Sequence, residues 1–217
     1  MAEVSAKLVK ELRDKTSAGM MDCKKALQEA NGNLDEAIAV LRKKGLKNVN
    51  KRAGKVASEG VVHTYIHGEG KIGVMLELNC ETDFVSRGDD FKDLAHAISM
   101  HIAWANPRFL DKDSVPESVL QQEAEIHKSQ LKPAQAAMAD KIIEGKMKKF
   151  FEENCLVDQI DIRDAASKKS ISDLMNDLSA KVGEKITLRR FTRFELGEGI
   201  EKASVDFAKE VQEAMNA

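Results

Sequence analysis

The architecture of this chain is best approached from residues 61–85, VVHTYIHGEGKIGVMLELNCETDFV. The hydrophobic period changes here from 3.6 residues, typical of a helix, to 2 residues, typical of a strand. Together with the turn residues Gly68-Glu69-Gly70, this pattern predicts a β-hairpin. The second strand is expected to bury one face, made by Ile72, Val74, Leu76, Leu78 and Cys80. Because a hairpin is not stable alone, helices must cover that face.

Two segments elsewhere in the chain complete this unit. Residues 186–196, ITLRRFTRFEL, are predicted to form a third strand, with a bulge near Phe191 because Phe191 breaks the alternation of its neighbours. Residues 89–105 have the helical period and are the expected cover of the sheet, through Phe91, Leu94, Ile98, Ile102 and Trp104.

The chain before the hairpin is predicted to be helical. Residues 1–45 contain three short amphipathic segments, and Asn31-Gly32 separates the second from the third. Asn33 is a candidate N-cap, with Glu36 three residues later to complete a capping box. Gly45 is expected to end the third helix as a C-cap.

Residues 46–60 are predicted to form a basic linker. With the preceding residues 42–44 they place seven basic side chains between Glu36 and Glu59, with no acid among them. Two interpretations remain open: a solvated helix end followed by a linker, or an arm that meets an acidic partner or RNA phosphates.

The segment after the sheet-covering helix is predicted to form a helical hairpin. Residues 114–153 contain two helical patterns around Lys132-Pro133, with Ser114 as a candidate cap of the first. The apolar stripe is thin, which favours a hairpin that stands off the body of the protein. Residues 199–217 are expected to form one more amphipathic helix. The predicted fold class is therefore α+β: a small antiparallel sheet covered by helices, with helices at both ends of the chain.

Composition excludes several classes of protein. The chain has 217 residues, 34 basic and 36 acidic, so its net charge of −2 argues against a polybasic protein bound to nucleic acid. Aromatic residues make up 5%, too few for a platform that stacks bases. No apolar run approaches the length of a membrane span, and the first residues carry charges throughout. Three dispersed cysteines, Cys23, Cys80 and Cys155, indicate buried thiols in a reducing compartment, and we expect a cytoplasmic protein.

Motifs typical of catalysis, metal binding or cofactor binding are weak in this sequence. Residues 68–73, GEGKIG, have the spacing G-x-G-x-x-G, but a strand follows them where a dinucleotide-binding loop needs a helix. His63 and His67 lie about 13 Å apart if they share a strand, too far to hold one zinc ion. No nucleophile motif is present. We therefore expect a binding protein without catalytic residues, metal or cofactor, and not an enzyme.

Three positions stand out as candidates for contact with a partner. Phe84-Val85 is an apolar pair in a polar loop, and either anchors that loop or is presented outward. Met20-Met21 lies at a helix junction, where a methionine pair is more often core than surface. His101 lies among apolar residues, for which a hydrogen-bonded, half-buried histidine is the default interpretation.

At these positions the sequence resembles a known family, bacterial elongation factor Ts. The resemblance is carried by residues 8–27, LVKELRDKTSAGMMDCKKAL, by residues 79–85, NCETDFV, and by residues 197–202, GEGIEK. It extends nearly from end to end. The family is the guanine-nucleotide exchange factor of elongation factor Tu, the GTPase that carries aminoacyl-tRNA to the ribosome.

The resemblance implies a domain layout: a ubiquitin-associated-like domain at 1–45, the linker at 46–60, an exchange and dimerisation core at 61–196 that includes the 114–153 hairpin, and a helical module at 197–217. It also implies that Thr82, Asp83, Phe84 and Val85 bind the partner, and that Asp83 and Phe84 insert beside its helices near the Mg²⁺ and phosphate site. The nucleotide-free form of the partner is the one expected to be preferred. The N-terminal docking surface would include Leu12, Met20 and Met21, and His101 would face the third domain of the partner.

Two features depart from the family pattern. Ser17 stands where the family commonly has glycine, and this puts the geometry of the docking loop in question. The chain also has one predicted hairpin before the helical protrusion, whereas longer members carry two related halves. The shorter members look like dimers, so we expect a homodimer. The alternative function is a non-enzymatic adaptor that binds ubiquitin-like folds or RNA through 1–45 and the basic segment.

Overall fold

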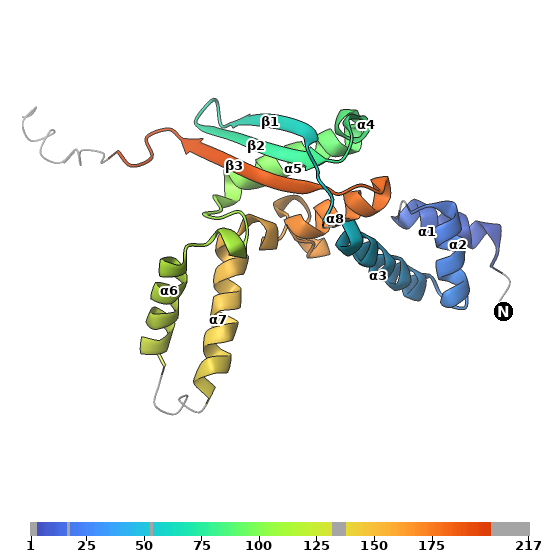
Figure 1. The fold of residues 1–217 in the computed structure, drawn as a ribbon, viewed down its shortest axis with the longest axis horizontal. Coiled ribbons are helices and arrows are strands. Elements are labelled where there is room, and N and C mark those ends of the chain that lie inside the picture. Colours follow the sequence, from blue (N-terminus) through green and yellow to red (C-terminus); the bar gives the residue numbers. More distant parts are fainter. Residues whose placement is uncertain (1–3, 17, 53, 132–137, 201–217) are drawn as a thin grey trace, which may run out of the picture.

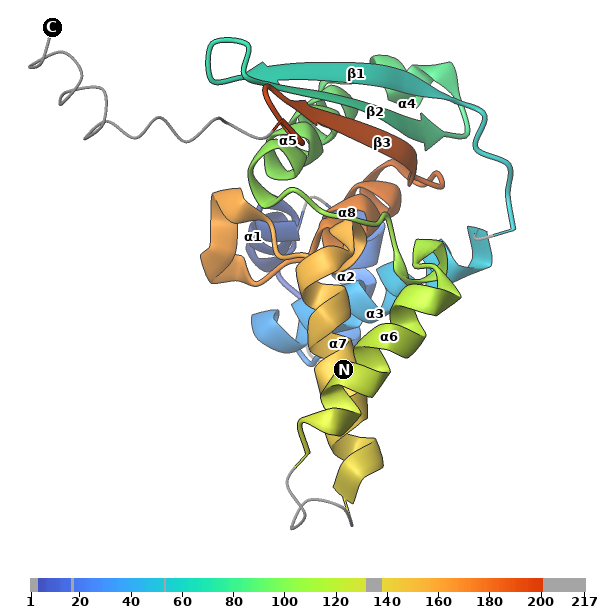
Figure 2. The same ribbon diagram turned by 90° about the vertical axis from the view of Figure 1, so that its left-hand side faces the viewer.

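The computed structural model describes residues 4–16, 18–52, 54–131 and 138–200, and its architecture is α+β, as the sequence predicts (Figure 1). A three-stranded antiparallel sheet of order β1-β2-β3 lies at the centre. The N-terminal helices lie at one end of the long axis of the molecule. A helical hairpin projects downward from the body, across the long axis (Figures 1 and 2).

The predicted hairpin is confirmed. It consists of β1 (Glu59–His67) and β2 (Ile72–Cys80), which pair in antiparallel register. Gly68, Glu69 and Gly70 form the turn with φ of 59°, 57° and 86°, a conformation that glycine adopts without steric cost. The predicted face of β2 is the buried one, through the side chains of Val74, Leu76, Leu78 and Cys80.

The third strand is also confirmed as β3 (Thr187–Glu195), but its bulge lies two residues earlier than predicted. Glu77 pairs with Arg190 and Leu78 with Leu188, so Arg189 is the extra residue. The bulge reverses the alternation of the strand. Phe191 therefore packs against the core, and Phe194 is exposed on the opposite face.

One face of the sheet is covered by two helices, α5 (Asp89–Ala105) and α8 (Ile171–Val182). The predicted cover by residues 89–105 is confirmed for Phe91, Leu94, Ile98 and Ile102, which are buried. The prediction was wrong for Trp104, which is 74% exposed because it lies two residues after the buried Ile102 and so on the opposite side of α5. Helix α8 carries no prediction above, although the capping box Ser170–Asp173 marks its start.

The other face of the sheet is not covered by any described element (Figure 2). It exposes a group of apolar side chains from all three strands, together with a charged group. Glu77 on β2 accepts a hydrogen bond from Arg190 Nε at 2.7 Å and one from Arg189 Nη1 at 2.9 Å, and these bonds lower the pKa of Glu77. The exposed apolar side chains of this open sheet face are Val62, Ile66, Met75 and Phe194.

The N-terminal segment folds into α1 (Ala6–Thr16), α2 (Met20–Glu29) and α3 (Leu34–Arg52) around a small core of their own. Asn33 caps α3, since its Oδ1 accepts hydrogen bonds from the backbone N–H groups of Asp35 and Glu36. The Glu36 side chain makes no return bond to the Asn33 backbone among the hydrogen bonds of the described residues. The cap is therefore present and the predicted capping box is not.

The predicted end of the third helix at Gly45 was wrong. Helix α3 continues to Arg52, so part of the predicted 46–60 linker is helical. Gly45 instead lies where α3 contacts α8, and a Cβ atom at this position would come within 3.3 Å of the Ala180 Cβ. Arg42 on α3 pairs with Asp173 on α8 in the same contact, at 3.5 Å. The glycine therefore permits a close approach of two helices.

The predicted hairpin at 114–153 corresponds to α6 (Glu117–Ser129) and α7 (Ala139–Asn154), which pack against each other around Val115, Phe150 and Cys155. The cap assigned to Ser114 was wrong. Ser114 belongs to a short 3₁₀ turn, Lys112–Ser114, that Asp111 caps, and Pro116 precedes α6. Further 3₁₀ turns, Leu156–Asp158 and Ile162–Ser167, connect α7 to α8.

Three predictions fall outside the described residues. They concern Ser17 in the docking loop, the break at Lys132-Pro133, and the amphipathic helix at 199–217, of which only residues 199 and 200 are described. Within the described ranges, no helix combines the length and the hydrophobicity needed to cross a membrane.

Candidate functional site

Among the large apolar side chains of the described residues, Phe84 has the highest exposed fraction. It lies on the single-turn helix α4 (Asp83–Arg87) that follows β2. Its side chain is 86% exposed. The adjacent Val85 is half-buried and packs against the main core. Asp83 forms an ion pair with Arg87 at 2.8 Å on the same turn. The two open interpretations of the apolar pair thus divide between its members: Val85 anchors the turn and Phe84 is presented outward.

The backbone before α4 is held by contacts with other parts of the core. The carboxylate of Glu184 accepts hydrogen bonds from the backbone N–H groups of Glu81 and Thr82, and from the Thr82 hydroxyl. The Cys80 thiol donates to the Thr82 carbonyl at 3.1 Å. Burial, and secondarily the nearby charge of Glu184, raises the pKa of Cys80 to about 11, so the thiol keeps its proton at neutral pH.

A second exposed apolar site is the methionine pair at the start of α2. Met20 is 59% exposed and Met21 63% exposed, so the expectation that such a pair is core was wrong. Their helix packs through its other face, where Cys23, Ala26 and Leu27 are buried. Leu12 on α1 is fully buried in this N-terminal core. Leu12 therefore lies beneath the surface that carries the methionines, and its own side chain is not accessible to solvent.

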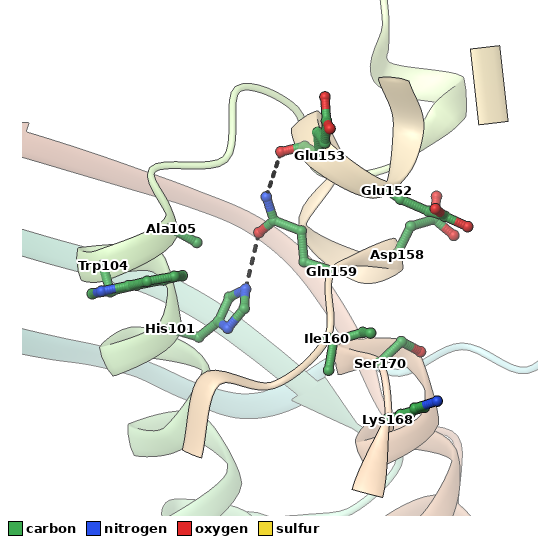
Figure 3. Close-up of a pocket in the computed structure, with 10 residues that line it drawn as sticks. All are labelled: His101, Trp104, Ala105, Glu152, Glu153, Asp158, Gln159, Ile160, Lys168 and Ser170. Atoms are coloured by element: carbon green, nitrogen blue, oxygen red, sulfur yellow. Dashed lines mark hydrogen bonds between the residues drawn. The ribbon is translucent and has the colours of Figure 1, made fainter. Parts of the chain in front are cut away.

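His101 lies inside the protein, 1% exposed, at the wall of a pocket of about 590 Å³ between α5 and the segment after α7 (Figure 3). Its Nε2 lies 2.9 Å from Gln159 Oε1, and its Nδ1 accepts a hydrogen bond from the backbone N–H of Ile162. Gln159 in turn donates to the Glu153 carbonyl. Burial is the main reason that the pKa of His101 is below its ordinary value.

The pocket beside His101 has the exposed apolar side chains of Trp104 and Ile160 on opposite sides of the histidine (Figure 3). Charged residues of both signs also line it: Glu152, Glu153, Asp158 and Lys168. Since both ring nitrogens of His101 are engaged internally, this residue shapes the pocket by holding Gln159 and Ile162 in place.

The structure brings the predicted residues together in part. Asp83, Phe84 and Val85 lie on α4, and Thr82 is its N-cap residue. Helix α4 lies in the half of the molecule nearer the N-terminal helices, which carry Met20 and Met21 (Figure 1). Leu12 and His101 lie beneath the surface.

Three side chains of the basic segment form ion pairs within the chain. Arg42 pairs with Asp173, Lys44 with Glu29 at 2.6 Å, and Lys55 with Glu81 at 2.7 Å. Because these basic side chains remain accessible to solvent, the pairs are weak, and both interpretations of the segment stay predictions.

The His, Cys, Asp and Glu side chains are dispersed with respect to a metal centre in the part of the chain that is described. No group of three or more His, Cys, Asp or Glu side chains there is arranged to hold a metal ion. The exposed apolar groups suit recognition of another macromolecule.

Sequence reasoning missed two residues that organise these sites, Glu184 and Gln159. Glu184 lies 102 residues from Thr82, and no local pattern relates the two positions. Gln159 lies in an irregular segment without periodicity. The segment before Glu184 did carry a signal, because Ser170 with Asp173 and the αL residue Gly183 delimit α8.

Comparison with known proteins assigns the chain to a family. Residues 1–198 match the family described as Elongation factor TS. The chain is 53% identical to elongation factor Ts of Desulfitobacterium hafniense, with both proteins covered completely. It is 53% identical to elongation factor Ts of Syntrophomonas wolfei over 96% of this chain and 97% of the relative, and 48% identical to that of Desulforamulus reducens over both full lengths. The chain thus belongs to the elongation factor Ts family of translation elongation factors.

Proposed function

We propose that this protein is a guanine-nucleotide exchange factor that binds elongation factor Tu and accelerates the release of GDP. Family membership supports the partner, and one structural observation supports the mechanism: Phe84 is exposed on a short helix whose backbone is held to the core. The protein contributes binding energy to a reaction of its partner and makes or breaks no covalent bond itself.

The thermodynamics of such a factor follow from linkage. If binding of this protein lowers the affinity of the GTPase for GDP by some factor, GDP must lower the affinity of the GTPase for this protein by the same factor. The protein therefore has to contact a conformation of the GTPase that nucleotide disfavours. The required energy has to come from groups that gain new contacts only in that conformation.

Phe84 has the properties of such a group. Its ring is exposed in the free protein, and transfer of a phenylalanine side chain from water to a protein interior contributes about 2–3 kcal/mol. Inserted between elements of the GTPase next to its Mg²⁺ and phosphates, the ring displaces groups that hold the nucleotide. Asp83, beside it, competes for polar groups that support the nucleotide-bound state.

The remaining predicted residues act around this insertion. Met20 and Met21 form the apolar centre of a second docking surface on the N-terminal helices, and Leu12 supports that surface from the core below. Thr82 and Val85 fix the turn that carries Phe84. His101 acts indirectly, by shaping the pocket where Trp104 and Ile160 are exposed. The site of action is the cytoplasm, where translation factors meet the GTPase.

The protein acts as a homodimer in this proposal, with a second copy on the open sheet face. Val62, Ile66, Met75 and Phe194 form an apolar group there, beside Glu77 and two arginines. Because this face carries both signs of charge, two copies related by a two-fold axis can place Glu77 of one opposite Arg190 of the other. A second copy therefore supplies the apolar cover that the described part of one chain lacks.

Release of fluorescent GDP from purified elongation factor Tu tests the function. The wild-type protein is expected to accelerate release, and Phe84→Ala to lose most of the acceleration while its thermal unfolding is unchanged. Val56→Ala is the control, since Val56 is an apolar side chain of comparable exposure (81%) outside the site. Equal acceleration by Phe84→Ala and wild type would contradict the proposed mechanism.

A further inference from the structure

The Glu184 carboxylate, in the turn between α8 and β3, joins two loops that are distant in sequence. Its Oε2 accepts hydrogen bonds from the backbone N–H groups of Glu81 at 3.1 Å and Thr82 at 3.0 Å, and its Oε1 accepts one from the Thr82 hydroxyl at 2.6 Å. The connection is reciprocal. The Glu81 carboxylate accepts from the backbone N–H of Lys185 at 2.8 Å and from Lys55 Nζ at 2.7 Å.

These bonds act on the residue that begins α4. Thr82 occupies the N-cap position, but its side chain makes no cap hydrogen bond, and its hydroxyl is oriented to donate to Glu184. A five-residue helix has little stability of its own. The direction in which α4 leaves the sheet is therefore set by what holds Thr82 and by the packing of Val85, and Phe84 follows two residues after Thr82.

We propose that Glu184 is a positioning residue for nucleotide exchange, which holds Thr82 so that Phe84 projects in a fixed direction. The inference rests on the function proposed above. A side chain already held in its binding orientation does not have to be ordered when the partner binds. A mobile turn, in contrast, loses conformational entropy on binding, and this loss weakens the complex.

Glu184 also relates the two docking surfaces to each other. It follows α8 by two residues, and α8 is the helix against which α3 packs through Gly45 and the Arg42–Asp173 pair. A continuous set of contacts thus extends from the N-terminal helices, through α8 and Glu184, to Thr82. The position of Phe84 therefore depends on α8, the same helix against which the N-terminal helices pack through α3.

The geometry distinguishes a role through hydrogen bonding from a role through charge. Both backbone N–H groups point to one oxygen, Oε2, which a glutamine side chain also possesses. The glutamine NH₂ group can donate to the Thr82 hydroxyl in place of the bond that Oε1 accepts. Glu184→Gln is therefore expected to keep Phe84 in place, and Glu184→Ala is expected to release it.

The test measures fluorescent-GDP release from elongation factor Tu at concentrations of each full-length variant well below saturation, where the rate includes the free-energy cost of ordering the turn on binding. Glu184→Ala is expected to reduce the accelerated rate about tenfold, the effect of ordering roughly one further residue on binding, and Glu184→Gln to stay within about twofold of wild type. Lys181→Met is the matched control, because it removes an ion pair between α8 and α5 (Lys181–Asp90, 2.8 Å) without touching Thr82.

Two further measurements separate positioning from a general loss of structure. Hydrogen exchange of the free protein should rise in Glu184→Ala at the amides of Glu81 and Thr82 and stay unchanged in α5. In the Phe84→Ala background, Glu184→Ala should reduce the rate no further, because the residue acts through the ring.

The outcomes distinguish the inference from the function on which it rests. If Phe84→Ala is defective and Glu184→Ala is not, the positioning role is overturned and the exchange function stands. A further tenfold loss in the Phe84→Ala background, or an equal loss in Glu184→Gln and Glu184→Ala, also overturns the positioning role. If Phe84→Ala accelerates release as wild type does, the role of the ring and the positioning role are overturned together and the exchange function stands. If wild type itself does not accelerate release, the exchange function is overturned.

Discussion

Residues that are adjacent in this sequence have opposite roles, and burial separates them. Val85 packs against the core while Phe84 is exposed, and Leu12 is buried below a surface on which Met20 and Met21 are exposed. A substitution at a buried position changes stability, whereas one at an exposed position changes contacts with a partner. The two effects can therefore be measured independently in the same small domain.

Leu12→Ala and Met21→Ala are predicted to differ in this way. Truncation of the buried Leu12 leaves a cavity and should destabilise the N-terminal helices by about 2–5 kcal/mol. Truncation of the exposed Met21 should change the free energy of unfolding by no more than about 0.5 kcal/mol and still weaken binding to elongation factor Tu. Thermal unfolding and titration calorimetry measure the two quantities. A stable Leu12→Ala variant would contradict this assignment.

His101 gives a prediction of pH dependence. Burial lowers its pKa from the ordinary value of 6.5, so the unfolded chain binds this proton more readily than the folded protein. The neutral ring therefore contributes its full stabilisation above pH 6.5, and this contribution is lost as the pH falls toward the lowered pKa. NMR titration of the ring should give a pKa below 6.5, and His101→Gln should weaken the dependence of unfolding free energy on pH. A ring that titrates above 6.5 would exclude this interpretation.

At the scale of the element, the sequence predicted what periodicity determines. The hairpin, the third strand and α5 each have a clear period of 2 or 3.6 residues, and each was found. Predictions based on a single residue were less secure. Glycine is typical of a C-cap, but at Gly45 the absence of a side chain instead permits close contact with α8. Ser114 belongs to the 3₁₀ turn before α6 and does not cap that helix.

The candidate site could be predicted from the sequence only in part. The motif at residues 79–85 identified Phe84 and Val85 as unusual, but the sequence left open which of them faces outward, because that depends on how α4 packs. Glu184 could not be found at all, since its contact with Thr82 joins residues about a hundred positions apart. Long-range hydrogen bonds leave no periodic trace in a sequence.

The contact between α3 and α8 gives a prediction for a whole element. Gly45→Leu places a side chain where a single carbon already lies 3.3 Å from the Ala180 Cβ, so the two helices must separate, at a cost of about 1–3 kcal/mol. We expect faster hydrogen exchange in α8 and weaker stimulation of GDP release. Gly145→Leu on α7 is the control, because a Cβ atom there meets nothing within 4 Å. Unchanged protection of α8 in Gly45→Leu would show that the contact is not tight.

At the scale of the whole molecule, the two faces of the sheet have different surroundings. Helices α5 and α8 cover one face, whereas the other exposes the apolar group of the open sheet face (Figure 2). The bulge at Arg189 contributes to this asymmetry, since it turns Phe191 to the core and Phe194 outward. A sheet with two apolar faces is typical of a protein that packs a second layer onto it.

That second layer is predicted to be the sheet of another copy. Phe194→Lys places a charge within the proposed interface and should shift the protein from dimer to monomer at micromolar concentration. Helical content should not change, because Phe194 is 70% exposed in the single chain. Ile126→Lys, at an exposed position on α6, is the control and should remain dimeric. Light scattering gives the mass of each variant. A monomeric wild-type protein would contradict the dimer, and a dimeric Phe194→Lys protein would place the interface away from the open sheet face.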